Sequence, residues 1–172
     1  ASSGAISCMF IQSFIDFYNN GGEISYDLTC AMNGLLSGLV AITASCSVVT
    51  PWAAVIIGVI AGPIYIAGSN LLIRLKIDDA VDAIPVHLGN GIWGVLAAGL
   101  FAAPEQVGAA YGSTQYGLFY GGGKLLAAQI CGLLFIIGWT TTIMLPFFWA
   151  LKRFDLFRVD SLEEEVGIDL VH

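Results

Sequence analysis

Long apolar segments alternate with short polar ones along this chain of 172 residues. No Asp, Glu, Lys or Arg occurs between Leu28 and Ile73. A single helix over that run would be about 69 Å long, more than twice the hydrocarbon thickness of a bilayer, which is about 30 Å. The run must therefore turn once. Pro51 places the turn at residues 45–51, because proline is tolerated in the first turn of a helix but not in its interior.

Charged residues and prolines limit the other apolar segments in the same way. A polar stretch follows Ile73, and Pro104 ends the next apolar run. The pattern predicts about five transmembrane helices, the first of them truncated at its start, at residues 1–18, 28–45, 51–73, 79–103 and 118–151. Residues 1–151 then form a membrane domain, and residues 152–172 form a polar tail.

The composition supports the same class. Hydrophobic residues make up 57% of the chain and charged residues 11%, against about 45–50% and about 25% in soluble domains. These values exclude a disordered chain and argue against a water-soluble globule. The net charge of −7 disfavours a nucleic-acid binder. We therefore expect an all-α, polytopic helical membrane protein.

The basic residues indicate how the helices are oriented. Lys and Arg favour the cytoplasmic side of a membrane. Five of the six follow the third and fifth segments, which end on the same side: Arg74, Lys76, Lys152, Arg153 and Arg158. The tail and loop 19–27 are therefore predicted to be cytoplasmic, and loops 46–50 and 104–117 external.

His87 is the candidate functional residue. It lies about 12 Å from the start of segment 79–103, close to the bilayer midplane. An ionisable group at that depth usually faces a cavity or a partner. A neutral imidazole could pass a proton or hold a small polar solute. The alternative is a packing histidine bonded to a neighbouring carbonyl. We expect no metal or cofactor, because the segment has no second ligand at helical spacing and the four cysteines form no CxxC pair.

Three carboxylates precede His87, namely Asp78, Asp79 and Asp82. Carboxylates at the start of a helix accept hydrogen bonds from its free N–H groups and interact favourably with its dipole. We interpret them as structural. The alternative, attraction of cations, is weaker because this side is the predicted cytoplasmic one.

Residues 76–94 read KIDDAVDAIPVHLGNGIWG and resemble the signature of the ammonium transporter (Amt/Mep/Rh) family. There a DDxxD segment precedes the second pore histidine by five residues, which is the position of His87. Residues 33–43 (NGLLSGLVAIT) resemble the family's eighth helix. Residues 117–126 (GLFYGGGKLL) are similar to the start of helix eleven in plant and algal members, and residues 163–169 (EEEVGID) to the cytoplasmic tail motif.

The resemblance implies an eleven-helix fold built from five-helix inverted repeats and a last added helix. This chain would supply the C-terminal half: the end of helix seven, helices eight to eleven, and a regulatory tail with Gly167 and Asp169 in its motif. It also implies a homotrimer in the plasma membrane that is not an enzyme. Ammonium would lose its proton and cross an apolar pore past two histidines, of which His87 is one.

The missing N-terminal half would hold the other pore histidine, so this chain alone should not conduct. Three positions depart from the family pattern, and one of them is Ala80, which stands where proline is common. Leu88 stands where glycine is usual after the histidine, which adds bulk beside the pore. Val171 stands where plant members have a phosphorylated threonine, so that switch should be absent. Two alternatives stay open: an ammonium-sensing membrane protein without net transport, and one half of a split transporter.

Overall fold

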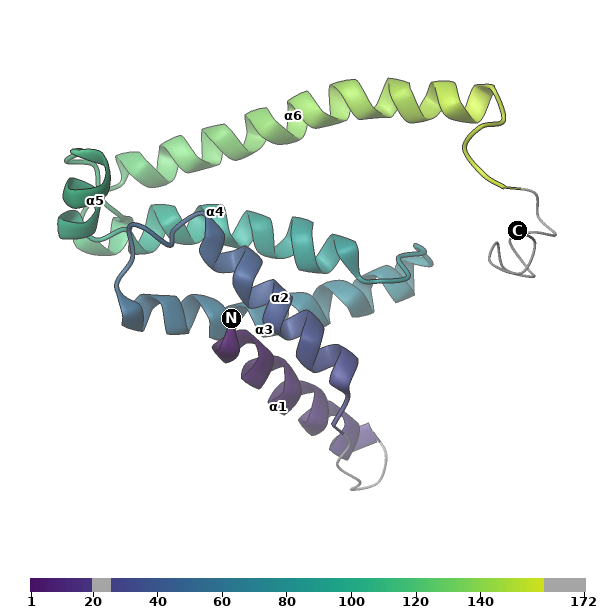
Figure 1. Ribbon diagram of the computed structural model, residues 1–172, viewed down its shortest axis with the longest axis horizontal. Coiled ribbons are helices and arrows are strands. Elements are labelled where there is room, and N and C mark those ends of the chain that lie inside the picture. The colour runs from purple at the N-terminus through teal and green to yellow at the C-terminus, as the bar shows by residue number, and fades with distance from the viewer. Residues whose placement is uncertain (20–25, 160–172) are drawn as a thin grey trace. The chain divides into compact units, whose positions relative to one another are not determined.

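The computed structural model describes residues 1–19 and 26–159, which contain helices, turns and no strand. The elements, in chain order, are α1 (Ser2–Asn19), α2 (Leu28–Thr43), α3 (Pro51–Leu75), the π-helical turn η1 (Ile84–Gly89), α4 (Asn90–Phe101), α5 (Pro104–Tyr111), the 3₁₀ turn η2 (Leu118–Tyr120) and α6 (Lys124–Arg153) (Figure 1). The all-α class predicted from the sequence is confirmed.

Local chemistry sets the limits of the first helices. The Asp27 carboxylate accepts the Thr29 N–H at 2.8 Å and caps α2. The turn predicted at residues 45–51 is confirmed, because α3 begins at Pro51. Lys76 ends α3 in the left-handed conformation, with φ of 56°. Its N–H donates to the Ile73 carbonyl at 3.1 Å.

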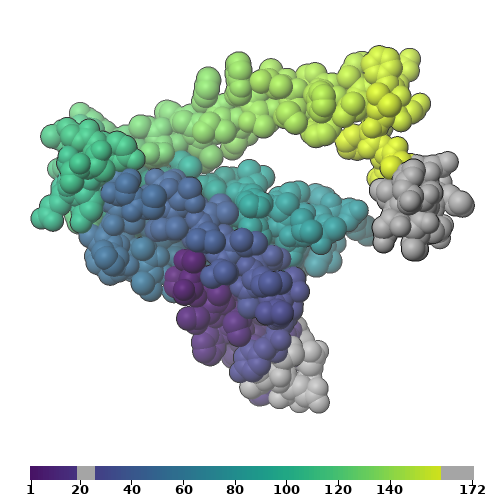
Figure 2. Space-filling model, viewed as in Figure 1, coloured from purple at the N-terminus to yellow at the C-terminus, as the bar shows by residue number. Residues whose placement is uncertain are grey.

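The chain forms two compact units, residues 1–131 and 132–172, whose boundary lies inside α6. In the first unit α1 packs against both α2 and α3. The α1 side chains meet those of α2 along one continuous surface in Figure 2. Glycine permits this approach. A Cβ atom on Gly4 would lie 2.6 Å from the Gly34 carbonyl oxygen, so the two backbones are in direct contact.

Small residues also bring α2 and α4 together. A Cβ atom on Gly94 would lie 2.6 Å from the Ala41 carbonyl oxygen. Around this contact lies an apolar cluster from α2, α3 and α4: Ala41, Ala53, Ile57, Ala61, Ala97 and Phe101. The Trp93 indole packs beside it and donates to the Ile57 carbonyl at 3.0 Å. The first unit is therefore held by close contact of small residues.

The second unit contains the rest of α6 and the residues that follow it. Phe135 and Trp139 stack one turn apart with ring centroids 6.3 Å apart. Phe148 contacts Phe157, which lies beyond the end of the helix, with ring centroids 5.6 Å apart. Leu156 donates its N–H to the Leu151 carbonyl at 3.0 Å. These contacts fold the described end of the chain back on α6.

Three helical stretches of the described residues are long and apolar enough to cross a membrane: Pro51–Leu75, Ile84–Phe101 and Lys124–Arg153. α2 is a shorter apolar helix of 16 residues, or about 24 Å. The polytopic membrane class is therefore supported by three helices that meet this criterion and one shorter apolar helix.

Three predicted limits are corrected. The fourth segment, expected to be helical from residue 79, begins at Ile84 after an irregular turn. The fifth segment, expected from residue 118, begins at Lys124, because Gly121 has φ of 92° and separates it from η2. The loop expected at residues 104–117 contains α5. Proline at the first position of α5 and left-handed Gly112 after its end are helix signals that hydropathy does not read.

The contact between α2 and α4 predicts unequal effects of two matched substitutions. Gly94→Ala should lower the free energy of unfolding of the full-length protein by about 1–3 kcal/mol, because its methyl group meets backbone that cannot move aside. Gly91→Ala on the same helix is the control, since nothing lies within 4 Å of its Cβ position. Thermal unfolding in detergent would measure both. Equal melting temperatures for the two variants would contradict the packing described here.

Candidate functional site

The segment between α3 and α4 is held by Asp79. Its two carboxylate oxygens accept the N–H groups of Ala83 at 2.9 Å and Ile84 at 2.7 Å. These are N–H groups at the start of η1, where no earlier helical turn supplies acceptors. Asp79 therefore stands as a helix cap, and it fixes where the π-helical turn begins.

Asp82 departs from the capping role expected for it. Its backbone is left-handed, with φ of 56°. Its carboxylate accepts the Tyr65 hydroxyl at 2.8 Å and the Ser69 hydroxyl at 2.9 Å, both from α3. Asn33 of α2 in turn donates to the Tyr65 oxygen at 3.1 Å. Asp82 therefore connects the irregular turn before η1 directly to α3, and through Tyr65 to α2.

Asp78, the third member of the acidic cluster, is exposed. Within the part of the chain that the structure describes, Asp78 makes no hydrogen bond or ion pair. The three carboxylates therefore differ in what they contact: Asp79 binds backbone, Asp82 binds side chains of α3, and Asp78 lies at the surface.

The π-helical turn that follows is buried on one side. Pro85 and Val86 are buried. Pro85 lies against α3 at Gly68, where an added Cβ would approach the Pro85 Cβ to 2.7 Å. Asn90, at the first position of α4, donates from its side-chain amide to the Pro85 carbonyl at 3.1 Å. The turn is thus fixed to α3 at one end and bridged by Asn90 at the other.

His87 lies on the other side of this turn, where its side chain is exposed. Within the described residues, the imidazole of His87 makes no hydrogen bond. The alternative of a packing histidine bonded to a carbonyl therefore has no support there. Ile84 and Leu88 beside it are 41% and 54% exposed. The turn therefore presents one imidazole among apolar side chains on a face that the described residues leave exposed.

Sequence reasoning did not find Asn33, Tyr65, Ser69 or Asn90. Each is an uncharged polar residue inside an apolar segment. That is the signal that could have found them, because a polar group at membrane depth needs a partner. Hydropathy averages hide such single residues.

The predicted tail motif and the expected absence of a metal both stay predictions. Gly167 and Asp169, the expected tail motif, lie outside the described residues. Among the described residues, no group of three or more His, Cys, Asp or Glu side chains could hold a metal ion.

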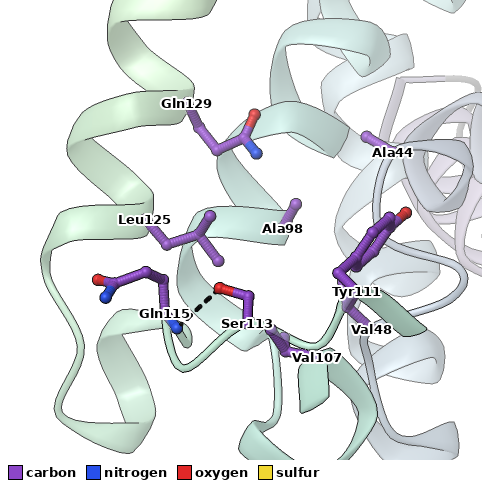
Figure 3. Close-up of a pocket in the computed structure, with 9 residues that line it drawn as sticks. All are labelled: Ala44, Val48, Ala98, Val107, Tyr111, Ser113, Gln115, Leu125 and Gln129. Atoms are coloured by element: carbon purple, nitrogen blue, oxygen red, sulfur yellow. Dashed lines mark hydrogen bonds between the residues drawn. The ribbon is translucent and has the colours of Figure 1, made fainter. Parts of the chain in front are cut away.

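A separate cavity of about 290 Å³ lies in the first unit between α4, α5 and the first turns of α6. Leu125 and Gln129 of α6 line one wall and Tyr111 of α5 another (Figure 3). On the loop after α5, the Gln115 N–H donates to the Ser113 hydroxyl oxygen at 3.1 Å. The residues that line the cavity include no charged side chain.

The apolar helices and the turn between α3 and α4, which is buried on one side, define a polytopic helical membrane protein. The chain belongs to the Ammonium Transporter Family, whose model matches residues 2–172. It is 46% identical to ammonium transporter 1 member 2 of Arabidopsis thaliana over 140 residues, which are 80% of this chain and 27% of that protein.

Solved structures agree. Saccharomyces cerevisiae Mep2 superposes with a TM-score of 0.79 at 26% identity, over 93% of this chain and 35% of that one. A protein described as a sensor Amt protein gives 0.75 at 33% identity, over 99% of this chain and 40% of that one. The chain therefore spans well under half the length of the proteins it matches.

The acidic cluster predicts different effects for adjacent aspartates. Asp79→Ala should lower the free energy of unfolding by about 1–2 kcal/mol, because the N–H groups of Ala83 and Ile84 lose their acceptor. Asp78→Ala, at an exposed position, should change it by less than about 0.5 kcal/mol. Thermal unfolding of the full-length variants would measure the difference. A larger loss for Asp78→Ala than for Asp79→Ala would contradict the capping geometry.

Proposed function

We propose that this chain is the C-terminal part of an ammonium transporter and forms one wall of its pore. The observation that carries the proposal is His87: an exposed imidazole on a buried, tightly held turn between two apolar helices. Membership of the family gives the substrate class. The low coverage of its relatives agrees with a pore completed by chain outside these residues.

The physical reason for a histidine at this place is the cost of moving ammonium through hydrocarbon. A bare cation is far more costly in an apolar pore than neutral ammonia. Ammonium therefore gives up its proton before it crosses. A neutral imidazole has one donating and one accepting nitrogen, so it can hold ammonia by a hydrogen bond and pass a proton along the path. Leu88 beside it keeps the path apolar and narrow.

The remaining finer features follow from the same proposal. His87 pairs with a second histidine supplied by the rest of the protein. Three copies assemble into a trimer in the plasma membrane, each with its own pore. Residues 152–172 form a cytoplasmic regulatory tail with Gly167 and Asp169 in its motif. The excess of Lys and Arg after α3 and α6 supports the cytoplasmic orientation.

A second candidate function is ammonium sensing without net transport. The similarity to the solved sensor Amt protein favours it, because the identity is 33% there and 26% with Saccharomyces cerevisiae Mep2. The two candidates differ in one measurable quantity, the net movement of ammonium across the membrane. A sensor of this kind would bind ammonium and give no sustained flux.

The role of His87 predicts the behaviour of one variant. In the full-length protein, reconstituted in liposomes, His87→Ala should reduce ammonium-evoked current by about a hundredfold, because the group that relays the proton is lost. Val81→Ala, at an exposed position in the preceding turn, is the control for expression and folding and should retain the current. Equal current in the wild type and His87→Ala would refute the assigned role, and a wild type with neither current nor flux would favour the sensor.

A further inference from the structure

Asn90 is a buried polar residue that the proposed mechanism leaves unused. Its side chain is 0% exposed, at the first position of α4 in an otherwise apolar helix. A buried amide is costly unless its hydrogen-bonding groups find partners. Its nitrogen has one, the Pro85 carbonyl at 3.1 Å, whereas its oxygen has none in the described chain. Asn90 is therefore placed for the contact with Pro85.

That contact spans the turn that carries His87. Pro85 lies two residues before His87, and Asn90 lies three residues after it. The Asn90 backbone N–H donates to the His87 carbonyl, and its side chain donates to the Pro85 carbonyl. π-helical turns are wide and rare, and they cluster at functional sites. One residue thus binds two carbonyls of the turn.

The other end of the turn is fixed to α3. Pro85 packs against Gly68 so closely that an added Cβ on Gly68 would lie 2.7 Å from it. The Pro85 carbonyl is therefore held in place when Asn90 binds it. Within the described residues, no other side-chain hydrogen bond reaches the backbone between Pro85 and Asn90, so the Asn90 amide is the polar contact that supports the backbone carrying His87.

We propose that Asn90 is a positioning residue for His87: its amide spans the π-helical turn and holds the imidazole in register with the ammonium path. The inference rests on the proposed function, since it assigns a purpose to the position of His87. It predicts that the contact with Pro85, and not merely burial at position 90, determines the transport rate.

Two substitutions separate the hydrogen bond from packing. Asn90→Asp keeps the shape, and its carboxyl group can donate to the Pro85 carbonyl only while it is protonated. Asn90→Leu removes the donor at every pH. Ser37 of α2 provides the matched control. Ser37 is also 0% exposed, and its hydroxyl oxygen has no hydrogen-bond partner within the described residues. It lies one turn before Ala41, where α2 meets α4.

The experiment measures ammonium uptake by the reconstituted full-length protein from about pH 4 to about pH 9, a range that covers an ordinary carboxyl group and also one whose ionised form is disfavoured by burial. Each rate is divided by that of the wild type at the same pH. The wild type and all variants keep the other titratable groups on the elements packed around the turn, namely His87, Asp79, Asp82, Tyr65, Cys30 and Cys8. Their contributions therefore largely cancel in this ratio.

For Asn90→Asp, the ratio should be near one at the acidic end and fall about tenfold as the carboxyl group loses its proton. Asn90→Leu should be low by a similar factor at every pH, and Ser37→Ala should stay near one. A ratio for Asn90→Asp that stays near one after its carboxyl group has ionised, or that is low by the same factor at every pH, would overturn the inference even if Asn90→Leu failed to fold. Absence of uptake by the wild type would instead overturn the proposed function, so the two failures are distinguishable.

Discussion

Inside a bilayer no water can complete the hydrogen bonds of an exposed backbone, so a break in a helix must be satisfied by the protein. The π-helical turn η1 is such a break, because it lies within the apolar stretch Ile84–Phe101. The Asp79 carboxylate binds the N–H groups at the start of the turn, and the Asn90 amide binds a carbonyl within it. Asp82 fastens the same segment to α3. These polar side chains satisfy backbone groups of the turn and attach it to α3.

The close packing of small residues serves the same turn. Because Gly68 has no side chain, Pro85 can lie directly against α3, and Gly94 lets α4 approach the backbone of α2. The turn is therefore held by rigid neighbours on its buried side. Its other side carries His87 among apolar residues, which is the arrangement that a pore for a neutral solute requires. Polar side chains around the path would instead bind the solute and slow its release.

Much of the fold could be predicted from the sequence, because charge-free runs and prolines mark helices in membranes. The turn before Pro51 and the limits of α3 followed from these rules. The π-helical turn did not, since hydropathy records how apolar a segment is and not whether its hydrogen bonds skip a residue. The candidate site divides in the same way. His87 was visible as an ionisable group at membrane depth. Tyr65 acts through contacts between segments distant in the sequence, and Asn90 is a single polar residue that a hydropathy average hides.

A high-resolution structure of the full-length protein would test the central claim most directly, because it would show what covers the exposed face of the π-helical turn. We expect the His87 ring to line an apolar channel inside a single protomer, with the Asn90 amide on the Pro85 carbonyl behind it. A His87 ring that faces lipid, or that lies buried in a contact between subunits away from any channel, would contradict the proposal.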